Sequence, residues 1–575
     1  MKRERLSTIT LMLFSMVIGV LSAVGAVCFR ALIELFGNLF WAPGVTFTHQ
    51  VVASPWWFRV VFPPSVGLMA GLLIVYVIPE ARGPGVPEVI LSVTNHQSRI
   101  RHRVTFFKTL VTSMLIGGGA SVGREGPIIQ IGASIGSSMA QVFRLDPAIR
   151  RVCLASGVAA GIAATFNAPI TGTLFAVEII LLDLELSHIS NIVIASVVGS
   201  VVSRIFLGEF PTFVAVDFVL YHFWELGVYL ALGLAGGFVA ILFIRTVGLS
   251  EDLFMGTRIF EWLKPAVGGL LLGVSALAFP QILGIGYDTV NAALTASLGL
   301  GAAVALLLVK MIATALCVGS GMSGGIFAPS LVLGATLGTA VGLAANQVFP
   351  GLDLNPAFYA LAGMGAVVAG TTLAPITAIM TIFELTNNEA VILPLMVACI
   401  SSVLVVRLLF GYSVYEMKLL RKGVNIVRGH DVGVLRHLVV KDFMDDDFET
   451  LPENASLPHI VERICESNYP HFVVLAGERL AGFLSLRDVR GVLNDFEMLR
   501  EIVVAADLMQ RKVITVSAAD NLETAFYRFE THHVSCLPVT PPDDPDRVVG
   551  ILRKDVLLNA YRERVLKDRL LSVPL

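Results

Sequence analysis

Two short segments of the chain have residue types that suit direct binding of a small anion. Residues 123–127 read GREGP and residues 325–329 read GIFAP, and a helical pattern follows each proline. Proline is favoured in the first turn of a helix, since its missing N–H would have no intrahelical partner there. The other N–H groups of that turn stay free, and a helix start carries about half a positive elementary charge. Two converging helix starts would therefore make an anion site.

Glu125 adds an ionisable side chain to the first of these segments. Its carboxylate, when deprotonated, can occupy the anion position itself, and when protonated or displaced it leaves that position to an ion. An acid within an apolar segment is a functional candidate, because burying it is costly. We therefore predict that Glu125 gates an anion path. The alternative is that Glu125 only pairs with Arg124 or caps its helix.

The two segments occupy corresponding positions of an internal duplication. Residues 117–136 align without a gap on residues 319–338 and share five glycines, a proline and a serine with them. Residues 154–178 match residues 361–384 in the same order, with one gap. Close packing of small residues explains isolated glycine matches, but not glycine, proline and serine kept in one register. Broken helices in corresponding positions of two repeats point to a transport site between the repeats.

The composition places these repeats in a lipid bilayer. Of the 575 residues 55% are hydrophobic and 15% charged, and the mean hydropathy is +0.78. Apolar runs long enough for a hydrocarbon core of about 30 Å recur up to about residue 420, for example 11–27 and 226–244. The first run is expected to be a span with a cytoplasmic N-terminus, rather than a cleaved signal peptide. We expect a multi-pass protein of the plasma membrane, or of the inner membrane in a bacterium, with both termini cytoplasmic.

The C-terminal part differs in composition from the rest. After residue 423 the apolar runs stop, and residues 442–449 begin an acidic stretch of mixed polarity. Residues 442–444 (DFM) and 472–475 (FVVL) are echoed by 507–509 (DLM) and 535–539 (SCLPV). This spacing predicts two strand-helix-strand-strand-helix units of about 65 residues each.

The combination of GREGP with GIFAP about 200 residues later resembles the CLC family of chloride channels and chloride/proton exchangers. The C-terminal units resemble a cytoplasmic pair of CBS domains. The resemblance implies an α-helical polytopic membrane domain over residues 1–425, with an inverted repeat of about 18 helices. It also implies an α+β CBS pair, with the first motif at 436–495 and the second at 500–566, and a homodimer with one anion path per subunit.

The resemblance also assigns roles to particular residues. Glu125 matches the external gating glutamate, and Tyr415 matches the tyrosine whose hydroxyl closes the central anion site from the inside. An aromatic anchor at the membrane interface is the other interpretation of Tyr415. Lys108 either adds positive potential to the path or extends to the interface. The backbone positions matched to the external and central anion sites are Arg124, Gly126, Ile326 and Phe327.

One departure from the family pattern concerns selectivity. Many chloride-selective relatives carry a serine hydroxyl in a Gly-Ser-Gly-Ile-Pro segment, whereas this chain reads GPGVP at the corresponding residues. Proline offers no hydroxyl donor, so part of the preference for a compact halide is expected to be lost, and nitrate stays open as a substrate. The anion-binding and path-lining positions of this segment are Gly83, Pro84, Gly85, Val86 and Pro87.

The second departure concerns proton coupling. Exchangers of the family often carry an internal proton-relaying acid at the position of Ile179, and an aliphatic side chain cannot relay a proton. The neighbouring Glu178 has a counterpart in Glu384, so both are expected to belong to the duplicated scaffold. The missing acid shifts the interpretation slightly toward passive permeation of chloride or similar small anions. Proton-coupled exchange of chloride or nitrate is the alternative.

Other functions find little support in the sequence. The CBS pair could bind an adenine nucleotide through Ser485 and Asp488, but the second unit lacks the matching hydroxyl, and a purely dimerising module is the alternative. No nucleophile-base pair is evident, so we do not expect an enzyme. The six cysteines show no CxxC spacing and are expected to be free and buried, with neither a metal site nor a disulfide framework.

Overall fold

The computed structural model divides the chain into two compact units, Met1–Lys422 and Gly423–Leu575. The described residues are 8–94, 97–182, 189–208, 213, 224–349, 354–386, 388–424, 426–427, 430–431, 435, 438–467, 469, 471–493, 496–511, 513–532 and 534–560.

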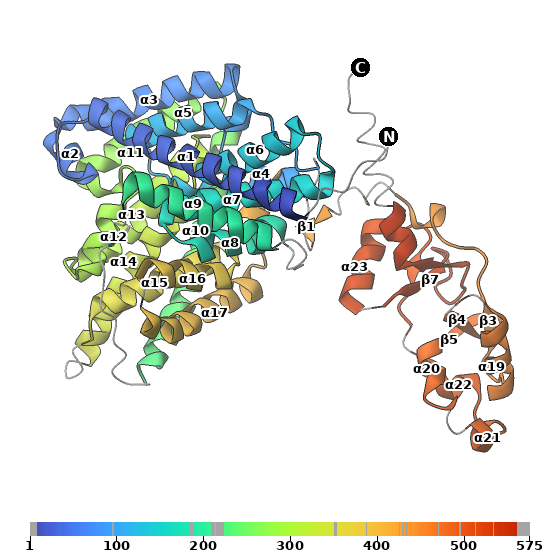
Figure 1. Ribbon diagram of the computed structural model, residues 1–575. Helices are drawn as coiled ribbons and strands as arrows, with labels where there is room; N and C mark the ends of the chain where they lie inside the picture. Colours follow the sequence, from blue (N-terminus) through green and yellow to red (C-terminus); the bar gives the residue numbers. More distant parts are fainter. Residues whose placement is uncertain are drawn as a thin grey trace. The chain divides into compact units, whose positions relative to one another are not determined.

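The regular elements of the first unit, up to Lys422, are all helices and no strands, as far as the structure describes its residues (Figure 1). Short 3-10 or π-helical turns η1 (Pro79–Ala81), η2 (Ala176–Leu181), η4 (Pro280–Ile282) and η5 (Glu389–Val391) interrupt the α-helices. The α-helices are α1 (Thr8–Phe40), α2 (Phe47–Ala53), α3 (Trp56–Tyr76), α4 (Val86–Thr94), α5 (Arg103–Gly117), α6 (Glu125–Val142), α7 (Pro147–Phe166), α8 (Pro169–Phe175), α9 (Ile189–Leu207), α10 (Glu225–Gly256), α11 (Lys264–Ala278), α12 (Tyr287–Leu294), α13 (Leu300–Gly319), α14 (Phe327–Val348), α15 (Pro356–Thr372), α16 (Pro375–Thr386), α17 (Ile392–Leu409) and α18 (Val414–Arg421).

Eight helical segments among the described residues are long and apolar enough to cross a membrane. The longest helices, α1 and α10, have 33 and 32 residues, which exceeds the roughly 20 residues needed to span the hydrocarbon core. Many of their large apolar side chains are exposed, as lipid-facing side chains are. The expectation of a multi-pass membrane protein is confirmed.

The duplication seen in the sequence appears as two matching series of helices. Helices α5 to α8 of the first repeat correspond to α13 to α16 of the second. A Cβ added to Gly132 of α6 would lie 2.1 Å from the carbonyl oxygen of Gly157 in α7, and one added to Gly334 of α14 would lie 2.3 Å from that of Gly363 in α15. The glycines therefore let each repeat bring its two central helices into backbone contact.

The second unit contains the strands of the C-terminal repeats. Strands β3 (Thr450–Pro452), β4 (His471–Ala476) and β5 (Arg479–Ser485) form one sheet, and β6 (Val516–Ser517), β7 (Cys536–Thr540) and β8 (Gly550–Arg553) form another. In each sheet the first pair is parallel and the second antiparallel. The remaining elements are β1 (Ile426–Val427), β2 (His430–Asp431), η7 (Val440–Asp442), α19 (Leu457–Glu466), α20 (Leu486–Arg490), α21 (Phe496–Leu499), α22 (Ala505–Leu508) and α23 (Leu522–His532).

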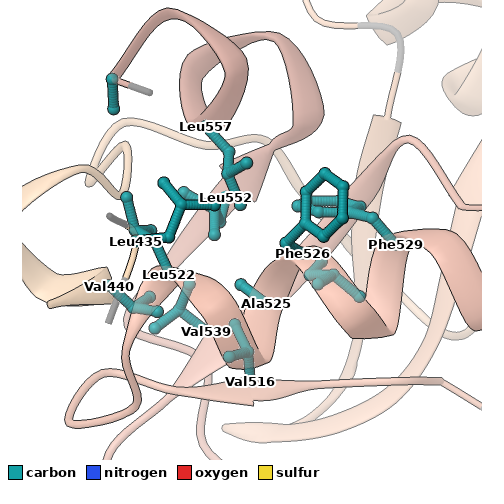
Figure 2. Packing of buried hydrophobic residues seen from close by; sticks show 12 residues of the cluster. Leu435, Val440, Val516, Leu522, Ala525, Phe526, Phe529, Val539, Leu552 and Leu557 are labelled. Atoms are coloured by element: carbon teal, nitrogen blue, oxygen red, sulfur yellow. The ribbon is translucent and has the colours of Figure 1, made fainter. Parts of the chain in front are cut away.

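Each sheet has its own apolar core. Phe526 and Phe529 of α23 pack beside Val516, Val539 and Leu552 of the second sheet (Figure 2). A separate cluster joins α19 and the first sheet. Two small α/β units, each with its own core, are what the internal repeat of the sequence predicted. A third cluster of Val473, Cys536 and Ile551 joins the two sheets.

The cysteines differ in part from expectation. All six are free, but Cys28 and Cys465 are exposed, so the prediction of uniform burial is wrong. Each lies on the exposed face of its helix. The spacing of cysteines in the sequence does not show which face of a helix they occupy. Among the described residues, no cluster of histidine, cysteine and carboxylate side chains has the geometry of a metal site.

Candidate functional site

The starts of the duplicated helices α6 and α14 meet inside the first unit. The backbone N–H of Gly123 donates to the carbonyl of Gly325 at 2.6 Å, and the N–H of Gly325 donates to the carbonyl of Gly123 at 2.7 Å. A Cβ on Gly325 would stand 2.7 Å from the backbone nitrogen of Gly126. Only glycine permits so close an approach, which sets the two positive helix ends side by side.

A third backbone segment, residues 83–85, joins these helix starts. Gly83 and Gly85 have φ values of +82° and +91°, in the left-handed region that favours glycine. A Cβ on Gly126 would lie 2.1 Å from the carbonyl oxygen of Pro84. Val86 and Pro87 follow in the first turn of α4 and are buried. The sequence-predicted selectivity segment therefore lies directly against the start of α6, where Pro84 presents a carbonyl and no hydroxyl.

Glu125 is completely buried at this junction. Its Oε1 accepts a hydrogen bond of 2.6 Å from the hydroxyl of Tyr287 and lies 3.8 Å from Nε of Arg124. Its Oε2 has no hydrogen-bond partner among the described residues and lies 2.6 Å from where a Cβ on Gly123 would stand. Pairing with Arg124 alone does not describe this side chain, because the shorter contact is to a phenol.

The two aromatic residues of the candidate path are also buried. Phe327 begins α14, and its ring centroid lies 6.0 Å from those of Phe166 and of Phe175. Tyr415 of α18 is 2% exposed and lies within electrostatic range of Glu125. A capping box between Ser413 and Glu416 fixes the start of α18. A tyrosine buried to this degree does not have the exposure of an interfacial anchor.

Lys108 does not extend to the membrane interface. It is fully buried, and its Nζ donates to the carbonyls of Ala81 at 2.9 Å and Gly83 at 2.8 Å. The lysine side chain therefore lies directly behind the 83–85 segment and fixes its conformation. This placement excludes snorkelling and keeps the lysine beside the predicted path.

Lys310 repeats this arrangement in the second half, and the sequence predictions missed it. Its Nζ donates to the carbonyls of Ile282 at 2.9 Å and Gly284 at 2.8 Å. A signal was present, because both lysines follow their glycine-containing loop by nearly the same spacing. The sequence GIG at residues 284–286 likewise corresponds to GPG at 83–85, and the next residue is Tyr287.

Glu178, which precedes Ile179, and its counterpart Glu384 both have a structural role. Glu178 accepts hydrogen bonds from the backbone N–H of Thr377 at 2.7 Å and from its hydroxyl at 2.6 Å, at the start of α16. Glu384 accepts from the N–H of Thr171 at 2.6 Å, at the start of α8. Each acid thus caps a helix of the other repeat. Ile179 itself is buried and offers no group that binds a proton.

Two cavities reach the duplicated glycine loops. One of about 780 Å³ touches Gly83 and is lined by the cations Arg82, Arg99, Arg101, Lys418, Arg421 and Lys422, together with Glu80, Glu88, Glu251 and Glu261; we call it the basic cavity. The other, of about 400 Å³, touches Gly284 and Tyr287. The excess of cations in the basic cavity suits the entry of anions.

The predicted nucleotide residues of the second unit bind each other. The hydroxyl of Ser485 donates to Oδ2 of Asp488 at 2.6 Å, and the backbone N–H of Ser485 donates to the same oxygen at 2.9 Å. They form the capping box of α20. Nucleotide binding stays a prediction.

Comparisons with known proteins agree with this architecture. The model of the Voltage gated chloride channel family matches residues 66–407, and that of the CBS domain matches 440–495 and 504–563. A ClcB-like chloride channel protein of Ralstonia nicotianae is 34% identical over 413 residues, covering 70% of this chain and 96% of that protein. The chain belongs to the CLC family.

Other CLC proteins are similar over comparable lengths. The H(+)/Cl(-) exchange transporter ClcA of Vibrio parahaemolyticus is 33% identical over 64% of this chain and 80% of its own length. A slow cyanobacterial Cl-/H+ antiporter has a similar structure, with a TM-score of 0.66, 25% identity and coverage of 72% of this chain and 97% of that one. A eukaryotic CLC transporter, with a TM-score of 0.63 and 23% identity, shows the same fold over 95% of this chain and 97% of its own. The predicted fold class, a CLC-type helical domain with a CBS pair, is confirmed, and so is transport of anions.

Proposed function

We propose that this protein exchanges chloride for protons across a membrane. The observation that carries the proposal is the buried carboxyl of Glu125 at the junction of two helix starts, where one of its oxygens accepts no hydrogen bond from any residue that the structure describes. The missing acid at Ile179 tips the sequence interpretation slightly toward passive permeation. The relatives named as exchange transporters or antiporters favour the alternative instead.

Glu125 and a chloride ion compete for the same positive backbone ends. Deprotonated Glu125 occupies the helix junction and closes the path. Protonation removes its charge, so that a chloride ion replaces it between the free N–H groups. Return of the carboxylate expels the ion and requires release of the proton. Exchange follows when Glu125 takes up its proton from one side of the membrane and releases it to the other, since each replacement of the carboxylate by chloride requires one proton.

Protons reach Glu125 without an acid at position 179. Gln130 follows Glu125 in α6 and lines the basic cavity, and its buried Oε1 has no hydrogen-bond partner in the described part of the chain. Water in the basic cavity can bind this oxygen and carry protons towards the start of α6. This route replaces a relay through Glu178, whose carboxylate is already committed to the N-terminus of α16.

Chloride is the proposed substrate, and nitrate is expected to permeate as well, because Pro84 presents no hydroxyl to the anion. The protein acts in a bilayer as a homodimer with a separate path in each subunit. The family resemblance supports this assembly.

The test is flux from proteoliposomes that hold the purified full-length protein. A chloride gradient is imposed, the voltage is held, and chloride and proton movements are recorded together. Uphill proton movement driven by chloride is expected, and Glu125→Gln should abolish it. The matched control is Glu384→Gln, which alters a scaffold acid and should keep coupling. Chloride flux without any proton movement would contradict the proposal and would show that the protein is a passive channel.

A further inference from the structure

Tyr287 is the one group among the described residues that hydrogen-bonds to Glu125 at less than 3 Å. It stands 162 positions from Glu125 in the chain and begins α12 in the second repeat. Neither an acid-base motif nor the first repeat predicts it, since the corresponding position there is Val86. The contact therefore distinguishes the two repeats.

The phenol is held rigidly in this place. Its ring lies edge-on to Phe213 with a centroid distance of 5.0 Å, and the guanidinium carbon of Arg124 lies 5.1 Å from its centroid. The preceding Gly286 has a φ of +94°, and Lys310 fixes the same loop through the carbonyl of Gly284. Ring packing and a lysine-anchored loop together set the direction of the O–H.

The hydroxyl and the guanidinium act on the same oxygen of Glu125. Tyr287 donates to Oε1, and Nε of Arg124 is 3.8 Å from it. A hydrogen bond to an ionised acceptor in a buried site is stronger than one to a neutral acceptor. This arrangement therefore stabilises the carboxylate more than the protonated acid.

We propose that Tyr287 is a positioning residue that holds deprotonated Glu125 in the anion path, so that chloride must displace a hydrogen-bonded carboxylate in order to bind. The inference rests on the gating role of Glu125 in the proposed function, but not on proton coupling. Arg124 contributes to the hold by its charge and by its cation-π contact with the Tyr287 ring.

Removing the hydroxyl should tighten chloride binding. Tyr287→Phe keeps the ring between Phe213 and Arg124 and deletes only the donor. A hydrogen bond to a charged group stabilises by roughly 1.5–3 kcal/mol, a factor of at least ten in an equilibrium constant. A competitor weakened by this factor lowers the Kd for chloride by about tenfold.

Isothermal titration of chloride into the purified full-length protein, at one fixed pH for all variants, measures this Kd directly. Tyr287→Phe is expected to bind about tenfold more tightly than the wild type. Tyr359→Phe is the matched control, because its buried hydroxyl has no hydrogen-bond partner among the residues described and its ring stacks on Tyr229. In a Glu125→Ala background, adding Tyr287→Phe should change the Kd by less than twofold.

The measured Kd values distinguish a failure of the proposed role of Tyr287 from a failure of the gating role of Glu125. An unchanged Kd in Tyr287→Phe, with tighter binding in Glu125→Ala, overturns the inference alone. An equal shift from Tyr287→Phe in the wild-type and Glu125→Ala backgrounds also overturns it, since the tyrosine would then act on the fold. If Glu125→Ala leaves the Kd unchanged, the gating role fails and the inference fails with it.

Discussion

Lys108 and Lys310 offer a perturbation whose effect should be confined to one loop each. Lys108→Met keeps an unbranched side chain that is one atom shorter, and it removes the hydrogen bonds to Ala81 and Gly83. Two buried hydrogen bonds contribute roughly 1–3 kcal/mol in total. A net loss of about 2 kcal/mol corresponds to roughly a thirtyfold rise in local opening of the loop.

Hydrogen exchange of the full-length protein, read by mass spectrometry, measures this opening. Lys108→Met should accelerate exchange in peptides that cover residues 81–85 and weaken chloride binding, because Pro84 and Gly85 contact the start of α6. Lys310→Met should instead accelerate exchange in residues 282–286, which precede Tyr287. Unchanged exchange in both loops, or acceleration of both loops by either variant, would refute the reasoning that each lysine fixes its own loop.

Three further changes test other parts of the structure. Glu178→Gln should destabilise the protein by about 1–2 kcal/mol by removing a charged cap from α16; thermal unfolding checks this, and lost proton coupling at unchanged stability would contradict a scaffold role. Pro84→Ser should raise the chloride-to-nitrate flux ratio in proteoliposomes, and an equal ratio would remove the selectivity argument. Burial lowers the pKa of His471 below its usual 6.5. Its contribution to stability is therefore present above pH 6.5 and lost as pH falls through the folded-state pKa, so thermal unfolding between pH 7.5 and 5.5 should be less pH-dependent in His471→Gln.

The sequence predicts the local features of the site well. Glycine, proline and helical periodicity define where α6 and α14 begin, because these signals act within a few residues of the helix start. The internal duplication further predicts that the starts of α6 and α14 contribute to the same site. For the same reason, Glu178 and Glu384 are predictable as a scaffold pair from their matching positions.

Contacts between the repeats are harder to predict, because they depend on how one repeat is inverted against the other. The partner of Glu178 is at Thr377, not in its own helix, and that of Glu125 is at Tyr287. No local pattern specifies either pairing. The internal alignment of residues 79–85 with 280–286 marks the second loop as important, but it does not show that the following tyrosine faces an acid of the first repeat.

The functional asymmetry of this protein lies in a few substitutions on a symmetric scaffold. Lys108 and Lys310 fix equivalent loops, and Gly123 and Gly325 pair symmetrically. The equivalent helix starts then differ, since one begins with Glu125 and the other with Phe327. The loops differ as well, because Val86 follows the first loop at residues 83–85, whereas the phenol of Tyr287 follows the second at residues 284–286. Inversion of the repeats brings that phenol to the acid. In the proposed function, the duplication therefore supplies the anion-binding backbone, and the differences between its halves supply the gate.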